Sequence, residues 1–157
     1  MMSIYRLLGF IVTIFSSFLA VVAIYGLFLA ASNPGILFQC FLLASVVLYS
    51  WLANRFFAQI IMLKNKMTKK QKDWLQVNAI VAFIFSVIGI IGCVGIVTDP
   101  NAALAIIKDF PENVNIDAAI ITKTGYVLLT IFVILFIHIG WTFLLIRKHK
   151  EQFEIPE

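Results

Sequence analysis

The sequence predicts an all-α integral membrane protein: a single domain, residues 1–157, built as a bundle of four membrane-spanning helices. Of its residues 62% are apolar and 13% are charged, whereas an average soluble domain is about half apolar and about a quarter charged. The mean hydropathy is +1.01. Four apolar runs are each long enough to cross a hydrocarbon core of about 30 Å. Lipid is therefore the natural solvent of this chain.

The first span is predicted at about residues 7–31, with no charged residue inside it. It is longer than the apolar core of a cleavable signal peptide, so we expect it to remain in the membrane. The turn-forming segment 32–35 (Ser-Asn-Pro-Gly) ends it. The second span follows at once, at about residues 36–63, so the two spans should form an antiparallel hairpin.

The third span is predicted at about residues 74–97, starting at Trp74, a residue type common at membrane interfaces. The fourth is predicted at about residues 124–146, and the basic residues Arg147 and Lys148 close it.

The loop between these spans, residues 98–123, is the longest outside the membrane. Asp99 and Pro100 predict a helix start, and we expect a short outer helix over residues 102–110. Asp117 offers a second start, in which case the fourth helix begins before residue 124.

Positive charge predicts one orientation. The loop at residues 64–73 is strongly basic and should stay in the cytoplasm, because basic loops translocate poorly. Both termini then lie in the cytoplasm, and the membrane is the plasma membrane (in a bacterium, the inner membrane). Nine of the twelve Lys and Arg residues fall on this side and two on the other, with Arg55 left out. Five loop lysines should attract anionic lipid head groups: Lys64, Lys66, Lys69, Lys70 and Lys72.

The sequence carries no signature of catalysis or of cofactor binding. Its two cysteines, Cys40 and Cys93, stand alone in apolar runs, so there is no dithiol motif. It has no Gly-rich phosphate loop, no His-Glu-x-x-His motif and no carboxylate inside a predicted span. Aromatic residues do not interleave with the basic clusters, which argues against a nucleic-acid partner. We expect no catalytic residue, no cofactor and no metal.

Arg55 is the one charged residue inside a predicted span. If the interface lies at Lys64, Arg55 is about 13 Å inside the hydrocarbon. It then needs a partner such as Trp51 or Gln59, each one helical turn away. If the interface lies at Arg55 itself, the guanidinium reaches the head groups and residues 56–63 extend beyond the membrane. We favour the second alternative, and the sequence leaves both open.

His138 is the only histidine inside a predicted span, at a predicted depth similar to that of Arg55. Polar residues around the two could form a layer in the inner half of the bundle that binds an anion or a lipid head group. The alternative is ordinary hydrogen bonding between helices. The members of this layer would be Arg55, His138, Asn54, Gln59, Asn78, Trp51, Ser16 and Ser17.

Small residues recur along the third span at helical spacing. Such strips let helix backbones approach closely in lipid, and this one could face another span or another subunit. A weak likeness between residues 11–16 and 80–86 leaves open an internal duplication of a helical hairpin. The members of the strip are Ser86, Gly89, Gly92, Cys93 and Gly95.

Three functions remain. The sequence favours a small non-enzymatic membrane protein, an accessory or assembly subunit that forms a homo-oligomer or joins a larger membrane complex. The alternative is a transporter or channel for an anion or a lipid-like solute that uses the layer around Arg55 and His138. A membrane enzyme acting on lipid ranks last, for want of a nucleophile or an acid–base pair.

Overall fold

A computed structural model describes residues 2–29, 33–107 and 117–154 of the chain. Within these residues four helices are long and apolar enough to cross a membrane, which confirms that part of the prediction. A short helix precedes the last of them, and the second continues as a π-helix. The helices are α1 (Met2–Leu29), α2 (Pro34–Phe56), η2 (Phe57–Met62), α3 (Lys69–Thr98), α4 (Pro100–Ile107) and α5 (Ala118–Lys148).

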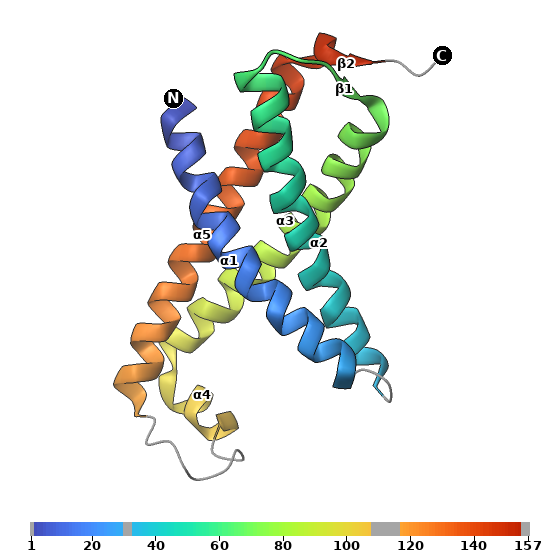
Figure 1. Cartoon of the computed structure of the whole chain (residues 1–157). Helices are drawn as coiled ribbons and strands as arrows, with labels where there is room; N and C mark the ends of the chain where they lie inside the picture. Colours follow the sequence, from blue (N-terminus) through green and yellow to red (C-terminus); the bar gives the residue numbers. More distant parts are fainter. Residues whose placement is uncertain (1, 30–32, 108–116, 155–157) are drawn as a thin grey trace.

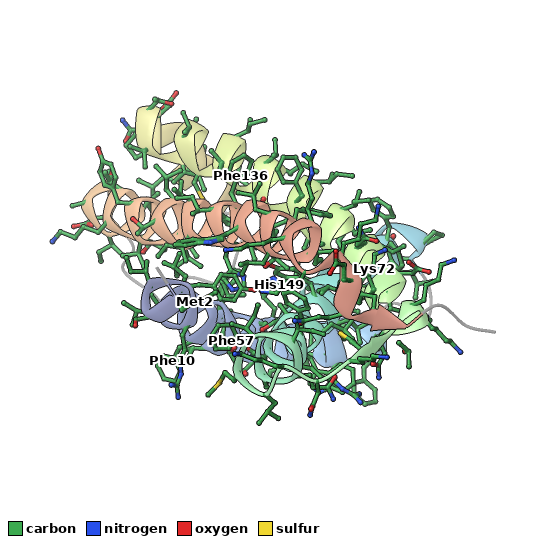
Figure 2. All side chains as sticks on the ribbon, turned by 90° about the horizontal axis from the view of Figure 1, so that it is seen from above. Met2, Phe10, Phe57, Lys72, Phe136 and His149 are labelled. Atoms are coloured by element: carbon green, nitrogen blue, oxygen red, sulfur yellow. The ribbon has the colours of Figure 1, made fainter. Side chains whose placement is uncertain are left out.

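The four long helices form two antiparallel pairs that cross one another (Figure 1). In one pair α1 packs on α2, and in the other α3 packs on α5. Contacts of α2 with α3 and of α1 with α5 close the bundle. Seen along the bundle in Figure 2, α5 lies between α3 on one side and α1 on the other.

The N-terminus, the connection from η2 to α3 and the C-terminal segment lie at one end of the bundle, which we call the basic end (Figure 1). The C-terminal end of α1, the start of α2 and the helix α4 lie at the opposite end. The three segments predicted to be cytoplasmic are therefore together at one end.

A short parallel strand pair closes the basic end. In it β1 (Met67–Thr68) pairs with β2 (Phe153–Glu154), which follows the 3-10 turn η3 (Lys150–Gln152). The side chain of Met67 is 1% exposed. The ring of Phe153 stacks on that of Phe56, with 6.2 Å between centroids. The pairing of β1, in the loop, with β2, in the C-terminal tail, was not predicted from the sequence.

Polar side chains cap the starts of α3 and α5. Thr68 accepts a hydrogen bond from the amide of Gln71 (3.3 Å), so residues 69–73 belong to α3 and not to a loop. Asp117 accepts one from the amide of Ile120 (2.7 Å), and α5 starts at Ala118, which is the alternative start that Asp117 offered.

The helix expected over residues 102–110 starts two residues earlier, at Pro100. Asp99 accepts a hydrogen bond from the amide of Ala102 (3.0 Å), and α4 runs over Pro100–Ile107. Residues 108–116 of the expected outer loop lie outside the described residues.

Candidate functional site

Four polar side chains from three helices meet in the core, and we call them the tyrosine–histidine cluster: Tyr5, Tyr49, His138 and Thr142. The hydroxyl of Thr142 lies 2.8 Å from that of Tyr5 and 2.9 Å from that of Tyr49. The hydroxyl of Tyr49 lies 2.8 Å from Nδ1 of His138. The ring of Tyr5 also stacks on the imidazole, with 4.5 Å between centroids. The cluster ties α1, α2 and α5 together.

A count of protons assigns the histidine tautomer. Thr142 donates its one hydroxyl proton to the carbonyl oxygen of His138 (2.8 Å), so it accepts from both tyrosines. The hydroxyl of Tyr49 thus donates its hydrogen bond to Thr142, and the same oxygen accepts one from Nδ1–H of His138. In the neutral ring Nε2 then carries a lone pair and no proton. This nitrogen has no hydrogen-bond partner among the described residues, and a Cβ atom added to Gly9 would lie 3.2 Å from it.

A second set of polar groups joins α1 to α2. The amide nitrogen of Asn54 donates to the hydroxyl of Thr13 (2.7 Å), which itself donates to the carbonyl oxygen of Gly9 (2.7 Å). Ser16 and Ser17 both donate to the carbonyl oxygen of Thr13. Asn54, Ser16 and Ser17, which we predicted as members of one polar layer, thus serve hydrogen bonding within and between two helices.

Arg55 lies on a different face of α2, toward the start of α3. Its guanidinium carbon is 5.6 Å from the ring centroid of Trp51. With Lys70, Gln71 and Trp74 it lines a groove of about 330 Å³ between α2 and α3. Arg55 is therefore level with the first two turns of α3. A membrane interface at Lys70 would also place Arg55 among the head groups, which is the second of the two alternatives.

The structure does not bring Arg55 and His138 into one layer. His138 is 1% exposed and faces Tyr49 in the core, whereas Arg55 is half-buried and faces the outer groove. Tyr49 precedes Arg55 by six residues, about 9 Å along the helix. The sequence predicts the depth of each residue but not the side of its helix on which that residue lies.

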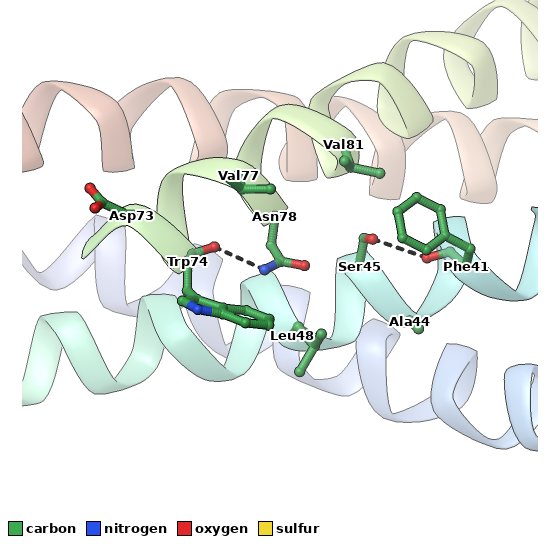
Figure 3. Close-up of a pocket in the computed structure, with 9 residues that line it drawn as sticks. All are labelled: Phe41, Ala44, Ser45, Leu48, Asp73, Trp74, Val77, Asn78 and Val81. Carbon is green, nitrogen blue, oxygen red and sulfur yellow. Dashed lines mark hydrogen bonds between the residues drawn. The ribbon is translucent and has the colours of Figure 1, made fainter. Parts of the chain in front are cut away.

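A second groove, of about 430 Å³ (Figure 3), shares Leu48 and Trp74 with the groove at Arg55. We call the two together the α2–α3 furrow. Ser45 and Asn78 line it, but each donates to a carbonyl oxygen of its own helix, at 3.0 and 2.8 Å. Asn78, another predicted member of the layer, thus donates a hydrogen bond within its own helix. The remaining walls of this second groove, apart from Asp73 at its mouth, are apolar: Phe41, Ala44, Leu48, Trp74, Val77 and Val81.

Gln59 lies in η2, near the basic end, with a half-buried side chain. The backbone carbonyl oxygen of Gln59 accepts a hydrogen bond from the backbone N–H of Asn65 (2.9 Å). Like Arg55, it is not part of the tyrosine–histidine cluster.

The predicted strip of small residues divides between two faces of α3. Ser86 and Cys93 are buried, and a Cβ atom at Gly89 would lie 2.5 Å from the ring of Phe132 in α5. At Gly92 and Gly95 an added Cβ atom meets nothing within 4 Å. Part of the strip thus packs against α5, and two glycines face away from the described chain.

Two other close approaches were missed from the sequence. A Cβ atom at Gly125 would lie 2.9 Å from Val97, and one at Gly26 would lie 2.8 Å from the sulfur of Cys40. Gly26 stands alone in an apolar run, whereas Gly125 follows residues 122–124 (Thr-Lys-Thr), and neither setting predicts a close approach.

No protein-family model, no curated protein and no solved structure matches this chain. Among the described residues no group of three or more His, Cys, Asp and Glu side chains could hold a metal ion. The geometry offers two features of functional interest: an outward face of α3 that carries exposed glycines, and the α2–α3 furrow with Arg55 at one end.

Proposed function

We propose that this chain is a small non-enzymatic integral membrane protein that acts by association within the bilayer, as an accessory or assembly subunit. It self-associates or joins a larger complex through the outward face of α3. The basic end faces the cytoplasm, α4 lies on the outer side, and the membrane is the plasma membrane.

The observation that carries this proposal is the contrast between the hydropathy of α3 and its burial. Its most apolar window has a mean hydropathy of 2.9, against 2.0 to 2.6 for the other three spans. Only 17% of that window is buried, against 33% to 39% in the others. Little of the most apolar helix is thus covered by the rest of the chain.

An exposed stripe on α3 has the shape that helix association in lipid favours. Ile88, Ile91, Gly92 and Gly95 recur at intervals of three and four residues, and all are exposed. The two glycines leave a shallow notch flanked by isoleucines. Such notches let a second helix approach closely, so that van der Waals packing can drive association without a hydrophobic effect.

A mass measurement on the protein purified in mild detergent tests this proposal. We expect a particle larger than one chain, or a co-purifying protein. Gly92→Ile and Gly95→Ile should reduce it to a single chain, because each fills the notch without touching the rest of its own bundle. Gly140→Ile is the matched control, since that exposed glycine of α5 also has nothing within 4 Å of an added Cβ atom. A single chain in the unchanged protein, with nothing bound, would argue against association.

The lysines near the basic end support the proposed orientation. Lys64, Lys66, Lys69 and Lys70 are exposed and Lys72 is half-buried. Together they would attract the anionic inner leaflet, at about 1 kcal/mol for each charge near the surface.

The second candidate is a transporter or channel for an anion or a lipid-like solute. It is supported by the unpartnered Nε2 of His138 in the bundle and by the guanidinium of Arg55 at the furrow. Flux of a labelled anion into liposomes tests it. Arg55→Gln should abolish this flux, whereas equal flux with and without Arg55 would remove that residue from the mechanism.

A further inference from the structure

We propose that the α2–α3 furrow is a binding site for one anionic phospholipid, with the phosphate between Arg55 and Lys70 and one acyl chain along the apolar part. This inference goes beyond association through α3 and does not depend on it. The site lies at the basic-end half of α3, whereas the exposed glycines lie in its other half.

The apolar part of the furrow suits a hydrocarbon chain. It has two polar side chains, and each donates a hydrogen bond to a carbonyl oxygen of its own helix: Ser45 to that of Phe41 and Asn78 to that of Trp74. From Arg55 to Phe41 the furrow follows fourteen residues of α2, about 21 Å of helix, whereas one leaflet of the core is about 15 Å thick. A chain entering at Arg55 can therefore lie in the furrow over the depth of its leaflet.

The mouth of the furrow suits an anionic head group. Arg55 and Lys70 line it together, and Lys69 and Lys70 line a shallower extension with Asp73. Three positive charges thus face one carboxylate. In the described residues the guanidinium of Arg55 has no hydrogen-bond or ion-pair partner, and its contact is the ring of Trp51. Its donors are free for a phosphate, which guanidinium binds with two parallel hydrogen bonds.

Two tryptophans mark the level of the head groups. Trp51 and Trp74 line the mouth from α2 and α3, with side chains 57% and 53% exposed. Tryptophan is enriched where hydrocarbon meets head groups. Along the furrow the cationic groups come first, then the tryptophan rings and then the apolar part. This order matches the phosphate, the interfacial region and the acyl chain of a phospholipid. Neither a free phosphate nor an apolar helix of a partner matches the whole of this sequence of surfaces.

Quenching of tryptophan fluorescence by a brominated lipid tests the site in the full chain. Trp141→Phe leaves Trp51 and Trp74 as reporters, because the chain has three tryptophans. This protein is placed in phosphatidylcholine vesicles with a minor share of phosphatidylglycerol, and the bromine is put on one lipid or on the other. We expect stronger quenching by brominated phosphatidylglycerol, with a relative association constant of about fivefold or more per matched charge. Equal quenching by both lipids would overturn the proposal.

Charge variants locate the head group. Arg55→Gln and Lys70→Gln should each lower the preference for phosphatidylglycerol by about fivefold, and Arg55→Lys should keep most of it. Arg6→Gln is the control, because Arg6 is exposed near the start of α1 and is not among the residues that line the furrow. The same loss with Arg6→Gln would mean general attraction to an anionic surface and would overturn the specific site.

A steric variant and a competing anion test the trough. Ala44→Phe fills the apolar part while Arg55 remains, and it should weaken the preference; Ala119→Phe, at an exposed position of α5, should not. An unchanged preference for phosphatidylglycerol in Ala44→Phe would contradict the proposal that an acyl chain lies in the apolar part of the furrow. Sodium phosphate should have no more effect than sodium chloride of equal ionic strength. Abolition by phosphate alone would assign the mouth to a small anion and overturn the lipid proposal.

Discussion

The phenolic oxygen of Tyr49 lies 2.8 Å from Nδ1 of His138, although 89 positions of sequence separate them. The same oxygen lies 2.9 Å from the hydroxyl of Thr142, which also binds Tyr5 of α1. Tyr49 thus connects α2 to α5 by two hydrogen bonds. Because Thr142 also binds Tyr5, loss of the Tyr49 hydroxyl should weaken the packing of three helices.

Tyr49→Phe should destabilise the bundle by about 1–2 kcal/mol, because it leaves the buried Nδ1–H donor of His138 without an acceptor. The measurement is the apparent Tm of the detergent-solubilised protein, followed by circular dichroism. Tyr126→Phe is the control, since that side chain is 56% exposed. Equal Tm values for the two variants would contradict the role given to Tyr49.

Gly89→Ala should cost about 1–3 kcal/mol, because the added methyl group overpacks the contact with α5. The ring of Phe132 lies 2.5 Å from the new Cβ position, and edge contacts with Phe15 and Phe85 hold it there.

Gly140→Ala, in α5 and outside the notch, should be neutral or slightly stabilising, since it meets no neighbour and removes a flexible glycine from a helix. The difference in apparent Tm between the two variants is the measurement. Gly89→Ala with Phe132→Leu should recover part of the loss, and equal Tm values for the two single variants would contradict the close contact.

Phe153→Ala should loosen the closure of the basic end. Its ring stacks on Phe56 and lies 5.5 Å from Nζ of Lys72, so its removal should cost about 1–2 kcal/mol. Trypsin cleavage after Lys64 or Lys66 should become faster, while Glu151→Ala, at an exposed position, should leave it unchanged. Unchanged cleavage of Phe153→Ala would show that the tail does not restrain the loop.

The orientation can be tested by labelling single cysteines in intact cells. With Cys40 and Cys93 replaced by Ala, Asn101→Cys should react with an impermeant maleimide added outside. Asn65→Cys and Glu151→Cys should react only after the membrane is opened. Labelling of Asn65→Cys in intact cells would contradict the proposed orientation, because it would place the basic end outside the cell.

The four spans were predictable because their signal is local. Each helix must be about 20 apolar residues long to cross the core, whatever it packs against. The capping role of Asp117 was likewise visible, because a cap involves residues three positions apart. The start of α3 was missed, because Lys69, Lys70 and Lys72 read as a loop, although Thr68 caps a helix that contains them.

The site was predictable only in its residue types. Arg55 and His138 were chosen because charged or polar groups are costly in lipid. In the structure His138 is buried in the tyrosine–histidine cluster and Arg55 lines the α2–α3 furrow. Their relation was not predictable, since depth follows from counting along the chain but the side of a helix that meets a neighbour does not. The pairing of Met67 with Phe153 was invisible for the same reason.

The sequence by itself determined the number of spans and the grouping of basic residues, because transfer of side chains into lipid acts on each residue where it stands. Only the tertiary structure decided that Tyr49 meets His138 in the core while Arg55 turns outward to Lys70 and Trp74. Those contacts depend on the rotation and crossing of helices, which small residues and buried hydrogen bonds set jointly, and which no single segment encodes.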